Sequence, residues 1–420
     1  MTTIPTGVKK NLLRSLSAAP EGFDRTCLMP QPLTRCPSRI SSLALDISGR
    51  CNLACRYCAE SATQPKNRPP MEPGQLKDIR LFMLKQGQEL ASFRLGSGEP
   101  MLNKPLLHEL QRLIESGFPV SGARRPEVFI TTNGTLIEKD DIDWLAASGW
   151  NVKISIDGPA SVHDRWRVFP GGNGTHARIS GIVRVLAERM PEKFSVTAVL
   201  TAGSDPEKVF TALASLGVRR IELVPAVHED PAIPPQNEDL ERYREFIDRY
   251  VERAAASETG LPQLVRFSNR VARIMGYDNS YVQCGAGRNF LGVGPEGEFY
   301  PCFRFIGVKA YRMGSIAAGL DSRLADSFRK GPARPWSERN ACTKCWAAPL
   351  CGGPCFAVTE LFGPGEGEPL PLQCAFTLIE SHGAWKLFDA LQKQSPEKLL
   401  AYLPSALRNH EKAYRTGQTT

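Results

Sequence analysis

The sequence predicts an α/β protein: a partial (β/α)6 TIM-like barrel followed by a small irregular C-terminal domain organised around metal. Three observations lead to this fold class. Six short apolar runs alternate with amphipathic stretches between about residues 42 and 228, and polar motifs follow the ends of these runs. In addition, ten of the twelve cysteines form two blocks with metal-ligand spacing. Apolar runs that alternate with helical patterns indicate parallel strands joined by βαβ crossovers.

Each predicted strand is short and precedes an amphipathic stretch. In chain order the predicted strands are Ser42–Ile47, Ser92–Leu95, Glu127–Thr132, Val152–Asp157, Phe194–Leu200 and Arg220–Pro225. The predicted helices are Gly74–Leu90, Pro105–Ser116, Lys139–Ala147, His176–Arg189, Pro206–Leu216 and Asn237–Ala256. In the second of these, Leu106, Leu107, Leu110 and Ile114 recur at helical spacing, which predicts one buried face.

Composition divides the chain into four parts. Residues 1–40 contain five prolines, which predicts an extended arm, and residues 41–256 form the predicted barrel. Residues 275–380 are rich in Gly, Pro and Cys and lack regular periods, as expected of a small domain folded around metal. A helical pattern begins near Phe376 and continues into a helical tail, residues 381–420.

Composition and charge exclude several classes of function. At 420 residues and 42% hydrophobic residues, the chain is long enough for a large domain and a smaller one. The net charge of +8 is dispersed, which predicts a mildly basic solvated surface; an acidic substrate or partner is the alternative, and no nucleic acid is expected. No signal peptide and no membrane span of about 18 apolar residues is found, so we expect a cytoplasmic protein without membrane contact.

The first cysteine block has the pattern C-x3-C-x2-C, formed by Cys51, Cys55 and Cys58 directly after the first predicted strand. Thiolates are soft ligands that select iron–sulfur clusters, zinc or Cu(I). A zinc site is usually closed by four ligands, whereas three thiolates on a [4Fe–4S] cluster leave one iron free for chemistry. Half of a zinc knuckle is the alternative, but no His or fourth Cys lies nearby in the sequence.

Polar motifs follow the other predicted strands. Active sites of parallel α/β folds lie at the carboxyl ends of the strands. In this chain the motifs at those ends are Gly96-Ser97-Gly98-Glu99-Pro100, Asn133-Gly134-Thr135, and the pair Ser155 and Asp157. Their order predicts one site built from several strand ends.

The second block contains seven cysteines and no nearby histidine. Its members are Cys284, Cys302, Cys342, Cys345, Cys351, Cys355 and Cys374. Seven cysteines do not divide into closed four-ligand zinc sites, so a zinc ribbon is the weaker interpretation. In the reducing cytoplasm such clusters usually bind metal rather than form disulfides.

C-x3-C-x2-C after a first strand resembles the radical S-adenosylmethionine (radical SAM) superfamily. The resemblance implies a [4Fe–4S] cluster on Cys51, Cys55 and Cys58 whose unique iron chelates S-adenosylmethionine (AdoMet). Electron transfer from the cluster then cleaves AdoMet to a 5′-deoxyadenosyl radical, which abstracts a hydrogen atom. In such enzymes the protein orients the cofactor and excludes side reactions.

Gly98, Glu99 and Pro100 resemble the end of the superfamily's Gly-Gly-Glu-Pro element, with Ser97 in place of its first glycine. The resemblance implies that these residues hold the methionine amino group of AdoMet. Glycine suits this role because it allows a close approach of the backbone to a ligand. A surface turn is the alternative interpretation of the same residues.

Tyr57, Asn133, Ser155 and Arg167 are further cofactor contacts that the resemblance implies. Tyr57 would pack on adenine, with core packing as the alternative. Asn133 and Ser155 would contact ribose and carboxylate, although short polar residues also form turns. Arg167 lies in an element resembling one common in peptide-modifying members and would bind a carboxylate, with an ion pair on a helix surface as the alternative.

The seven cysteines match, in order and spacing, the pattern of SPASM domains, which hold two auxiliary [4Fe–4S] clusters. The resemblance implies one cluster on Cys342, Cys345, Cys351 and Cys374, and a second on Cys284, Cys302 and Cys355. The second cluster is one ligand short. Its fourth position is either open to substrate or water, or filled by Cys27 or Cys36 from the N-terminal arm.

One position departs from a related family. Sulfatase maturases carry an Asp directly after the cysteine equivalent to Cys302, where it accepts a proton. This chain has Phe303 followed by Arg304. Formylglycine formation by that route would therefore lack its proton acceptor.

The resemblance, to maturases of sulfatases and quinone cofactors, implies a radical SAM/SPASM enzyme that oxidatively cross-links or otherwise matures a peptide or protein substrate. Expected partners are a reductant such as flavodoxin or ferredoxin and a separate leader-binding protein. A radical dehydrogenase or epimerase of a small metabolite is the alternative enzyme. A non-catalytic electron-transfer or metal-scaffold protein is the alternative from another class.

Overall fold

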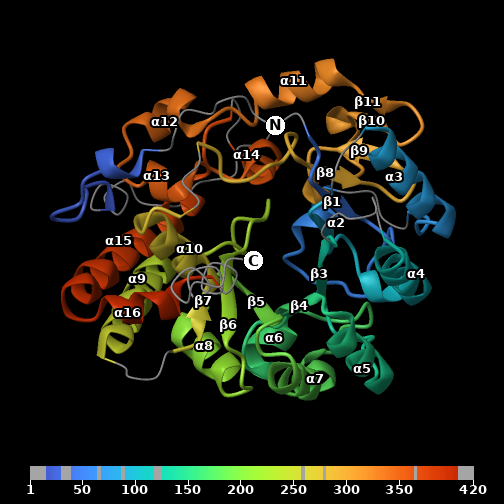
Figure 1. The fold of residues 1–420 in the computed structure, drawn as a ribbon. Helices are drawn as coiled ribbons and strands as arrows, with labels where there is room; N and C mark the ends of the chain where they lie inside the picture. Colours follow the sequence, from blue (N-terminus) through green and yellow to red (C-terminus); the bar gives the residue numbers. More distant parts are fainter. Residues whose placement is uncertain are drawn as a thin grey trace.

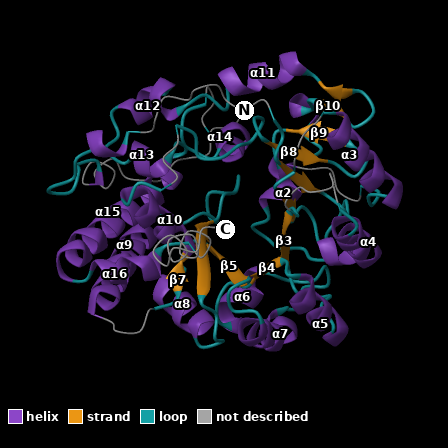
Figure 2. Ribbon diagram, in the orientation of Figure 1, coloured by secondary structure: helices purple, strands orange, loops and turns teal. Residues whose placement is uncertain are grey.

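A single curved sheet forms the centre of the molecule, with helices around its outside (Figure 1, Figure 2). The computed structural model describes residues 16–29, 39–63, 68–86, 90–117, 125–256, 261–277, 281–363 and 367–404. The strand order is β11-β10-β9-β8-β1-β2-β3-β4-β5-β6-β7, parallel from β8 to β7 and antiparallel from β8 to β11.

Eleven strands make up this sheet. They are β1 (Ser42–Leu45), β2 (Ser92–Leu95), β3 (Glu127–Thr132), β4 (Asn151–Ser155), β5 (Phe194–Leu200), β6 (Arg220–Pro225), β7 (Gln263–Leu264), β8 (Phe290–Val293), β9 (Glu298–Tyr300), β10 (Gly314–Ser315) and β11 (Gly319–Leu320). The strands β2, β3, β5 and β6 coincide with the predicted ones. The first strand ends earlier than predicted, because the chain turns at Gly49 with a φ of 65° and the Asp46 carboxylate accepts the Gly49 N–H at 2.8 Å.

Most strands of the barrel bury one face and leave the other partly exposed. In β5, Phe194, Val196, Ala198 and Leu200 are buried, while the residues between them are half-buried. The buried face packs against the surrounding helices, as the two-residue alternation of a strand requires. The other face lines the inside of the barrel and is called the inner face below.

Six described helices of the barrel region correspond to predicted ones, whereas two short helices, Ala59–Thr63 and Ala160–Trp166, were not predicted. The helices of this region are α2 (Ala59–Thr63), α3 (Pro73–Lys85), α4 (Lys104–Glu115), α5 (Lys139–Ser148), α6 (Ala160–Trp166), α7 (His176–Arg189), α8 (Pro206–Ala214) and α9 (Asn237–Ala256). In α4 the leucines and isoleucine at helical spacing are buried, as expected. Residues 87–89 of the predicted first helix lie outside the described residues.

The C-terminal region extends the barrel sheet, which the sequence did not predict. The strand β8 pairs in parallel with β1, so the polypeptide beyond residue 256 returns to the first strand of the barrel. Its helices are α10 (Val265–Ile274), α11 (Ser322–Lys330), α12 (Asn340–Thr343), α13 (Ala348–Cys351), α14 (Phe356–Phe362), α15 (Pro371–Gln394) and α16 (Pro396–Leu399). The helix α15 begins before the predicted Phe376 and therefore includes Cys374.

The described part of the predicted arm, residues 16–29, packs against the C-terminal region. The Phe23 ring lies 5.1 Å from each of the rings of Trp346 and Trp385, in edge-to-face geometry. The indole of Trp346 donates a hydrogen bond to Leu16 O at 3.0 Å, and that of Trp385 donates to Glu21 O at the same distance. No helix within the described residues is both long and apolar enough to cross a membrane.

A buried charge network joins α9, α10 and α15. Glu380 is fully buried and accepts hydrogen bonds from Arg266 at 2.8 Å and from the Tyr243 hydroxyl at 3.0 Å. Arg270, also buried, lies 3.8 Å from the second oxygen of the same carboxylate. Removing one member of such a network leaves the other charges desolvated without a counter-charge.

We predict that Glu380→Ala lowers the free energy of unfolding by about 3 to 5 kcal/mol, because it leaves the guanidinium groups of Arg266 and Arg270 without their counter-charge. The matched control is Lys386→Ala, which lies on the same helix as Glu380. It breaks an exposed ion pair of 2.6 Å with Asp248 of α9 and should change the free energy of unfolding by less than about 1 kcal/mol. Denaturant unfolding of both variants measures the difference. Equal losses would contradict a structural role for the buried carboxylate.

Candidate active site

The loop that carries the first cysteines is fixed at its base by a buried carboxylate. Asp46, directly after β1, is fully buried and pairs with Arg68. Burial raises the pKa of Asp46, and the Arg68 charge opposes that rise. Ser48 adds a hydrogen bond to Arg50 O at 2.9 Å, so the backbone just before Cys51 has little freedom.

Gly98 and Glu99 hold the segment that follows β2 against this loop. The Glu99 N–H donates to Arg50 O at 2.9 Å. Gly98 has a φ of 61°, and a Cβ at this position would collide with the carbonyl of Arg50. A glycine is therefore required here by backbone conformation and by the close approach of the cysteine loop.

The Glu99 side chain joins the ends of β2 and β3. One oxygen accepts from the Thr132 hydroxyl at 2.6 Å and from Met101 N at 2.9 Å, and the other accepts from Asn133 N at 2.7 Å. Burial raises the pKa of Glu99, and these donors oppose the rise. Pro100 opens the short buried turn Pro100–Asn103 that follows.

Asn133 connects the third strand end to the cysteine loop. Its amide donates to the Asn52 side chain at 2.9 Å and lies 3.7 Å from Cys51 Sγ. Asn52 in turn donates to the Thr135 hydroxyl at 2.9 Å. Sequence reasoning did not select Asn52; its only signal was an amide side chain directly after Cys51.

Tyr57, Asp157 and Arg167 form a buried cluster beside the cysteines. The Tyr57 hydroxyl donates to Asp157 Oδ2, and Arg167 Nε donates to the same oxygen at 3.1 Å. The other oxygen of Asp157 accepts from Val199 N at 2.9 Å. Arg167 is thus in a buried ion pair, so the alternative of a pair on a helix surface is wrong. The packing of Tyr57 against AdoMet stays a prediction.

A neutral histidine supports this cluster from behind. The Asp157 N–H donates to His163 Nδ1 at 3.1 Å, which places the proton of the ring on Nε2. That nitrogen donates to the Thr175 hydroxyl at 2.8 Å, and the hydroxyl donates to Arg167 O at 3.0 Å. Burial and, to a smaller extent, the Arg167 charge together lower the pKa of His163 to about 3.

Ser155 is the last residue of β4. It lies on the inner face, half-buried, in register with Thr197 of β5. Its role in cofactor binding stays a prediction.

The cysteines gather into three groups. In the first group, burial is the largest cause that raises the pKa of Cys51 to about 12 and that of Cys55 to about 11, and the charges of neighbouring thiolates contribute to both values. In the second group, Cys302 is close enough to Cys284 and Cys355 for their charges to raise its pKa above the effect of burial.

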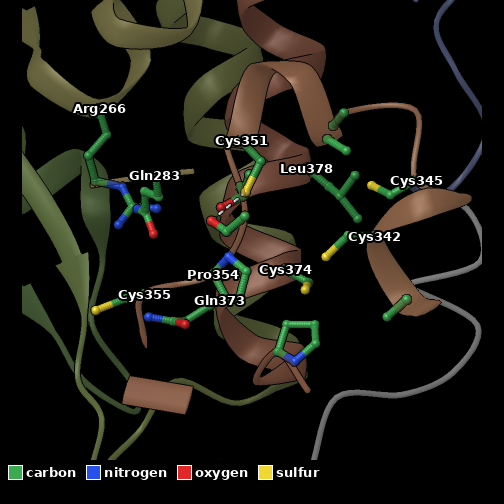
Figure 3. Close-up of a pocket in the computed structure, with 16 residues that line it drawn as sticks. Arg266, Gln283, Cys342, Cys345, Cys351, Pro354, Cys355, Gln373, Cys374 and Leu378 are labelled. Carbon is green, nitrogen blue, oxygen red and sulfur yellow. Dashed lines mark hydrogen bonds between the residues drawn. The ribbon is translucent and has the colours of Figure 1, made fainter. Parts of the chain in front are cut away.

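The third group consists of Cys342, Cys345, Cys351 and Cys374, whose charges raise the pKa of Cys374 further after burial has raised it. All four, with Cys355, line a cavity of about 80 Å³. Figure 3 shows the sulfur atoms of Cys342, Cys345 and Cys374 near one another, with Cys355 apart from them. The structure thus brings together the cysteine sets that the resemblance implied.

The structure does not describe the side chains of the remaining two cysteines. Cys36 lies outside the described residues. Cys27 belongs to the turn Thr26–Leu28, and its side chain is likewise not described. The fourth position of the Cys284, Cys302 and Cys355 group therefore stays a prediction.

The three groups fit iron–sulfur clusters by the chemistry of their donors. Desolvation and the charges of neighbouring thiolates raise the pKa of Cys51, Cys302 and Cys374, so these thiols become thiolates only when a cation compensates the charge. Iron is a thiolate-preferring metal. Among the described residues, no three His, Cys, Asp or Glu side chains form a site for a single metal ion.

Comparison with known proteins agrees with the motif and the geometry. Residues 45–215 match the family model of the Radical SAM superfamily. This stretch of the chain is a radical SAM domain. The domain implies AdoMet and one [4Fe–4S] cluster. That Cys51, Cys55 and Cys58 hold this cluster stays a prediction.

Similar proteins cover most of this chain. An uncharacterized protein of Archaeoglobus fulgidus is 25% identical over 73% of this chain and 71% of its own. A serine-type anaerobic sulfatase-maturating enzyme of Klebsiella aerogenes is 22% identical over 76% of this chain and 80% of its own. The solved structure of native anSMEcpe with bound AdoMet and Kp18Cys peptide has a TM-score of 0.70 at 19% identity, covering 84% of this chain and 99% of that one. This last similarity confirms the fold.

We predict that Asp157→Asn weakens AdoMet binding about tenfold or more, because Asp157 orients Tyr57 and Arg167 beside the cluster cysteines. Tyr57→Phe removes one hydroxyl and retains the ring, so it should weaken binding less. Anaerobic equilibrium binding of AdoMet to the reconstituted variants measures both effects. Wild-type affinity in Asp157→Asn would show that this cluster does not position the cofactor site.

We also predict an acid-dependent loss of stability caused by His163. Its folded pKa of about 3 lies below the value of about 6.5 in an unfolded chain, so only the unfolded chain gains a proton between these values. Stability should therefore fall as the pH drops below about 6.5, by up to about 1.4 kcal/mol per pH unit. Denaturant unfolding between pH 7 and 5 should give a shallower slope for His163→Gln and an unchanged slope for the exposed His108→Gln. An unaltered slope in His163→Gln would contradict this assignment.

Proposed function

We propose that this chain is a radical SAM enzyme that oxidatively modifies a peptide or protein substrate, by cross-linking or another maturation step. The observation that carries the proposal is the gathering of the second cysteine block into a group of four and a group of three. Seven thiols placed in this way support two auxiliary clusters beside the barrel. The similarity to a sulfatase-maturating enzyme and to a peptide-bound maturase fold supports a peptide substrate.

Different residues of the chain would hold the first cluster, AdoMet and the auxiliary clusters. Cys51, Cys55 and Cys58 would hold the first cluster, with Gly98 and Glu99 at the methionine end of AdoMet. Bound AdoMet supplies, on one-electron reduction, a 5′-deoxyadenosyl radical that abstracts a hydrogen atom. The cysteines of the second block would hold the auxiliary clusters that accept the electron removed from the substrate.

The formylglycine route is not part of the proposal. Phe303 follows Cys302 directly, so no carboxylate stands at the position where sulfatase maturases carry a proton acceptor. We infer oxidation at another kind of residue instead. The thiol ligands favour a reducing compartment such as the cytoplasm, with flavodoxin or ferredoxin as reductant and a separate leader-binding protein as further partners.

We predict that anaerobic reconstitution loads about twelve iron atoms per chain, four for each of three clusters. Cys51→Ala should lose about four of them and all formation of 5′-deoxyadenosine. Cys374→Ala should lose about four while AdoMet cleavage persists, because it removes a ligand of a different cluster. Iron analysis and chromatography of the nucleoside products measure both.

Mass spectrometry of candidate peptides from neighbouring genes then tests the substrate class. A loss of two hydrogens supports oxidation or cross-linking. An unchanged mass with solvent deuterium incorporated indicates an epimerase, and turnover of only a small metabolite would contradict the proposal. Failure to form 5′-deoxyadenosine would identify a non-catalytic metal protein.

A further inference from the structure

Several cationic side chains lie at or near the inner face of the barrel. Lys153 of β4 pairs with Glu222 of β6 at 2.6 Å across the inner face. Arg266 of α10 is neutralised by Glu380. Arg94 and Arg304 make no direct ion pair among the described residues, although Glu127 lies within electrostatic range of Arg94, and Glu60 and Glu222 lie within electrostatic range of Arg304.

Arg94 lies on the inner face of β2 and is exposed. Its guanidinium stacks over the Phe129 ring of β3 at 4.7 Å, and no hydrogen bond or ion pair holds it within the part of the chain that the structure describes. Partial desolvation lowers the pKa of Arg94, and the charges of Cys284 and Glu127 oppose this change. Arg94 therefore lies within electrostatic range of the three-cysteine group.

The register of the sheet places Cys302 and Arg304 close to Arg94. Gly292 of β8, Ala44 of β1 and Arg94 of β2 lie side by side in one row. A Cβ on Gly292 would lie 2.7 Å from the backbone of Cys302, so the Cys302–Phe303 turn rests directly on this row. Two strand spacings, about 10 Å, separate the backbone of Gly292 from that of Arg94.

Arg304 extends from this turn and is half-buried. It stacks on Phe303 at 5.6 Å and makes no hydrogen bond or ion pair with any residue that the structure describes. Burial raises the pKa of Glu60 to about 7, and the Arg304 charge opposes this rise. Lys153 and, more weakly, Arg304 hold the pKa of Glu222 below its usual range despite its burial. Arg304 thus lies between the first cysteine loop and the inner face.

A half-buried guanidinium without a partner is costly unless an anion reaches it. Arginine binds carboxylates in a bidentate geometry that fixes both position and orientation. We propose that Arg304 and Arg94 bind a carboxylate of the substrate between the AdoMet site and the group of Cys284, Cys302 and Cys355. The substrate is then a peptide with an acidic side chain, or with its free C-terminal carboxylate, next to the modified residue. This inference rests on the proposed function and specifies its substrate.

Three small probes test the recognition without turnover. They are N-acetylglutamate N-methylamide, its glutamine analogue, and N-acetylalanine with a free carboxylate. Isothermal titration calorimetry uses the full chain, reconstituted anaerobically and saturated with AdoMet. We expect a carboxylate probe to bind at least about tenfold more tightly than the uncharged glutamine probe. Preference for the glutamate probe assigns a side-chain carboxylate, and preference for N-acetylalanine assigns a chain terminus.

Variants locate the site. Arg304→Gln and Arg94→Gln should each weaken binding of the preferred carboxylate probe about tenfold, and Arg304→Lys should retain part of it. The matched control is Arg184→Gln, an exposed arginine of α7 on the outside of the barrel, which should bind as the wild type does. Equal binding of charged and uncharged probes, or unchanged binding in both Arg304→Gln and Arg94→Gln, would overturn the inference.

Iron content and 5′-deoxyadenosine formation in the same preparations separate the remaining outcomes. If Arg304→Gln loses iron, the binding of the carboxylate probe to Arg94→Gln decides whether the inference holds. Normal binding in Arg94→Gln would then mean that the arginines only support the iron–sulfur cluster. Intact AdoMet cleavage without carboxylate recognition would overturn this inference alone. Carboxylate binding in a protein that modifies no peptide would instead overturn the proposed function.

Discussion

The candidate site depends on three buried carboxylates that follow the strands β1, β2 and β4. Asp46 follows β1, Glu99 follows β2 and Asp157 follows β4, and each is exposed by 1% or less. A buried carboxylate is tolerated only when donors surround it. Here those donors come from the cysteine loop and from adjacent strand ends. The cost of burying the acids therefore becomes a constraint that fixes where the first three cysteines lie.

This constraint explains how much of the site the sequence could predict. Strand ends converge by topology, so Glu99, Asn133 and the first cysteines could be brought together from their order along the chain. The contributions of Asn52 and His163 could not, because their roles are set by individual hydrogen bonds within the site. Such bonds leave no periodic pattern in the sequence. Asp157 was visible as a strand-end residue, and Tyr57 and Arg167 were selected as implied cofactor contacts, but the hydrogen bonds that join the three were not predicted.

The fold shows the same division. Strands with clear alternation, such as β5, were predicted to the residue because burial of one face is a local property of the sequence. The strand β8 was missed because Phe290–Val293 contains Gly292, is followed directly by Gly294 and Pro295, and lies in the Gly- and Pro-rich part of the chain. Its place in the sheet comes from pairing with β1, nearly 250 residues away, and no local pattern records that pairing.

That long-range pairing connects the two cysteine blocks. Because β8 joins the edge of the barrel at β1, the Cys302 turn rests on Gly292 and faces the same interior as the first cysteine loop. The residue directly after Cys302 is therefore of chemical interest. In this chain it is Phe303, an apolar residue at the position where sulfatase maturases carry an acid, and the cation Arg304 follows it. A cation beside a position that lacks the acid favours a substrate that supplies the negative charge itself, as proposed above.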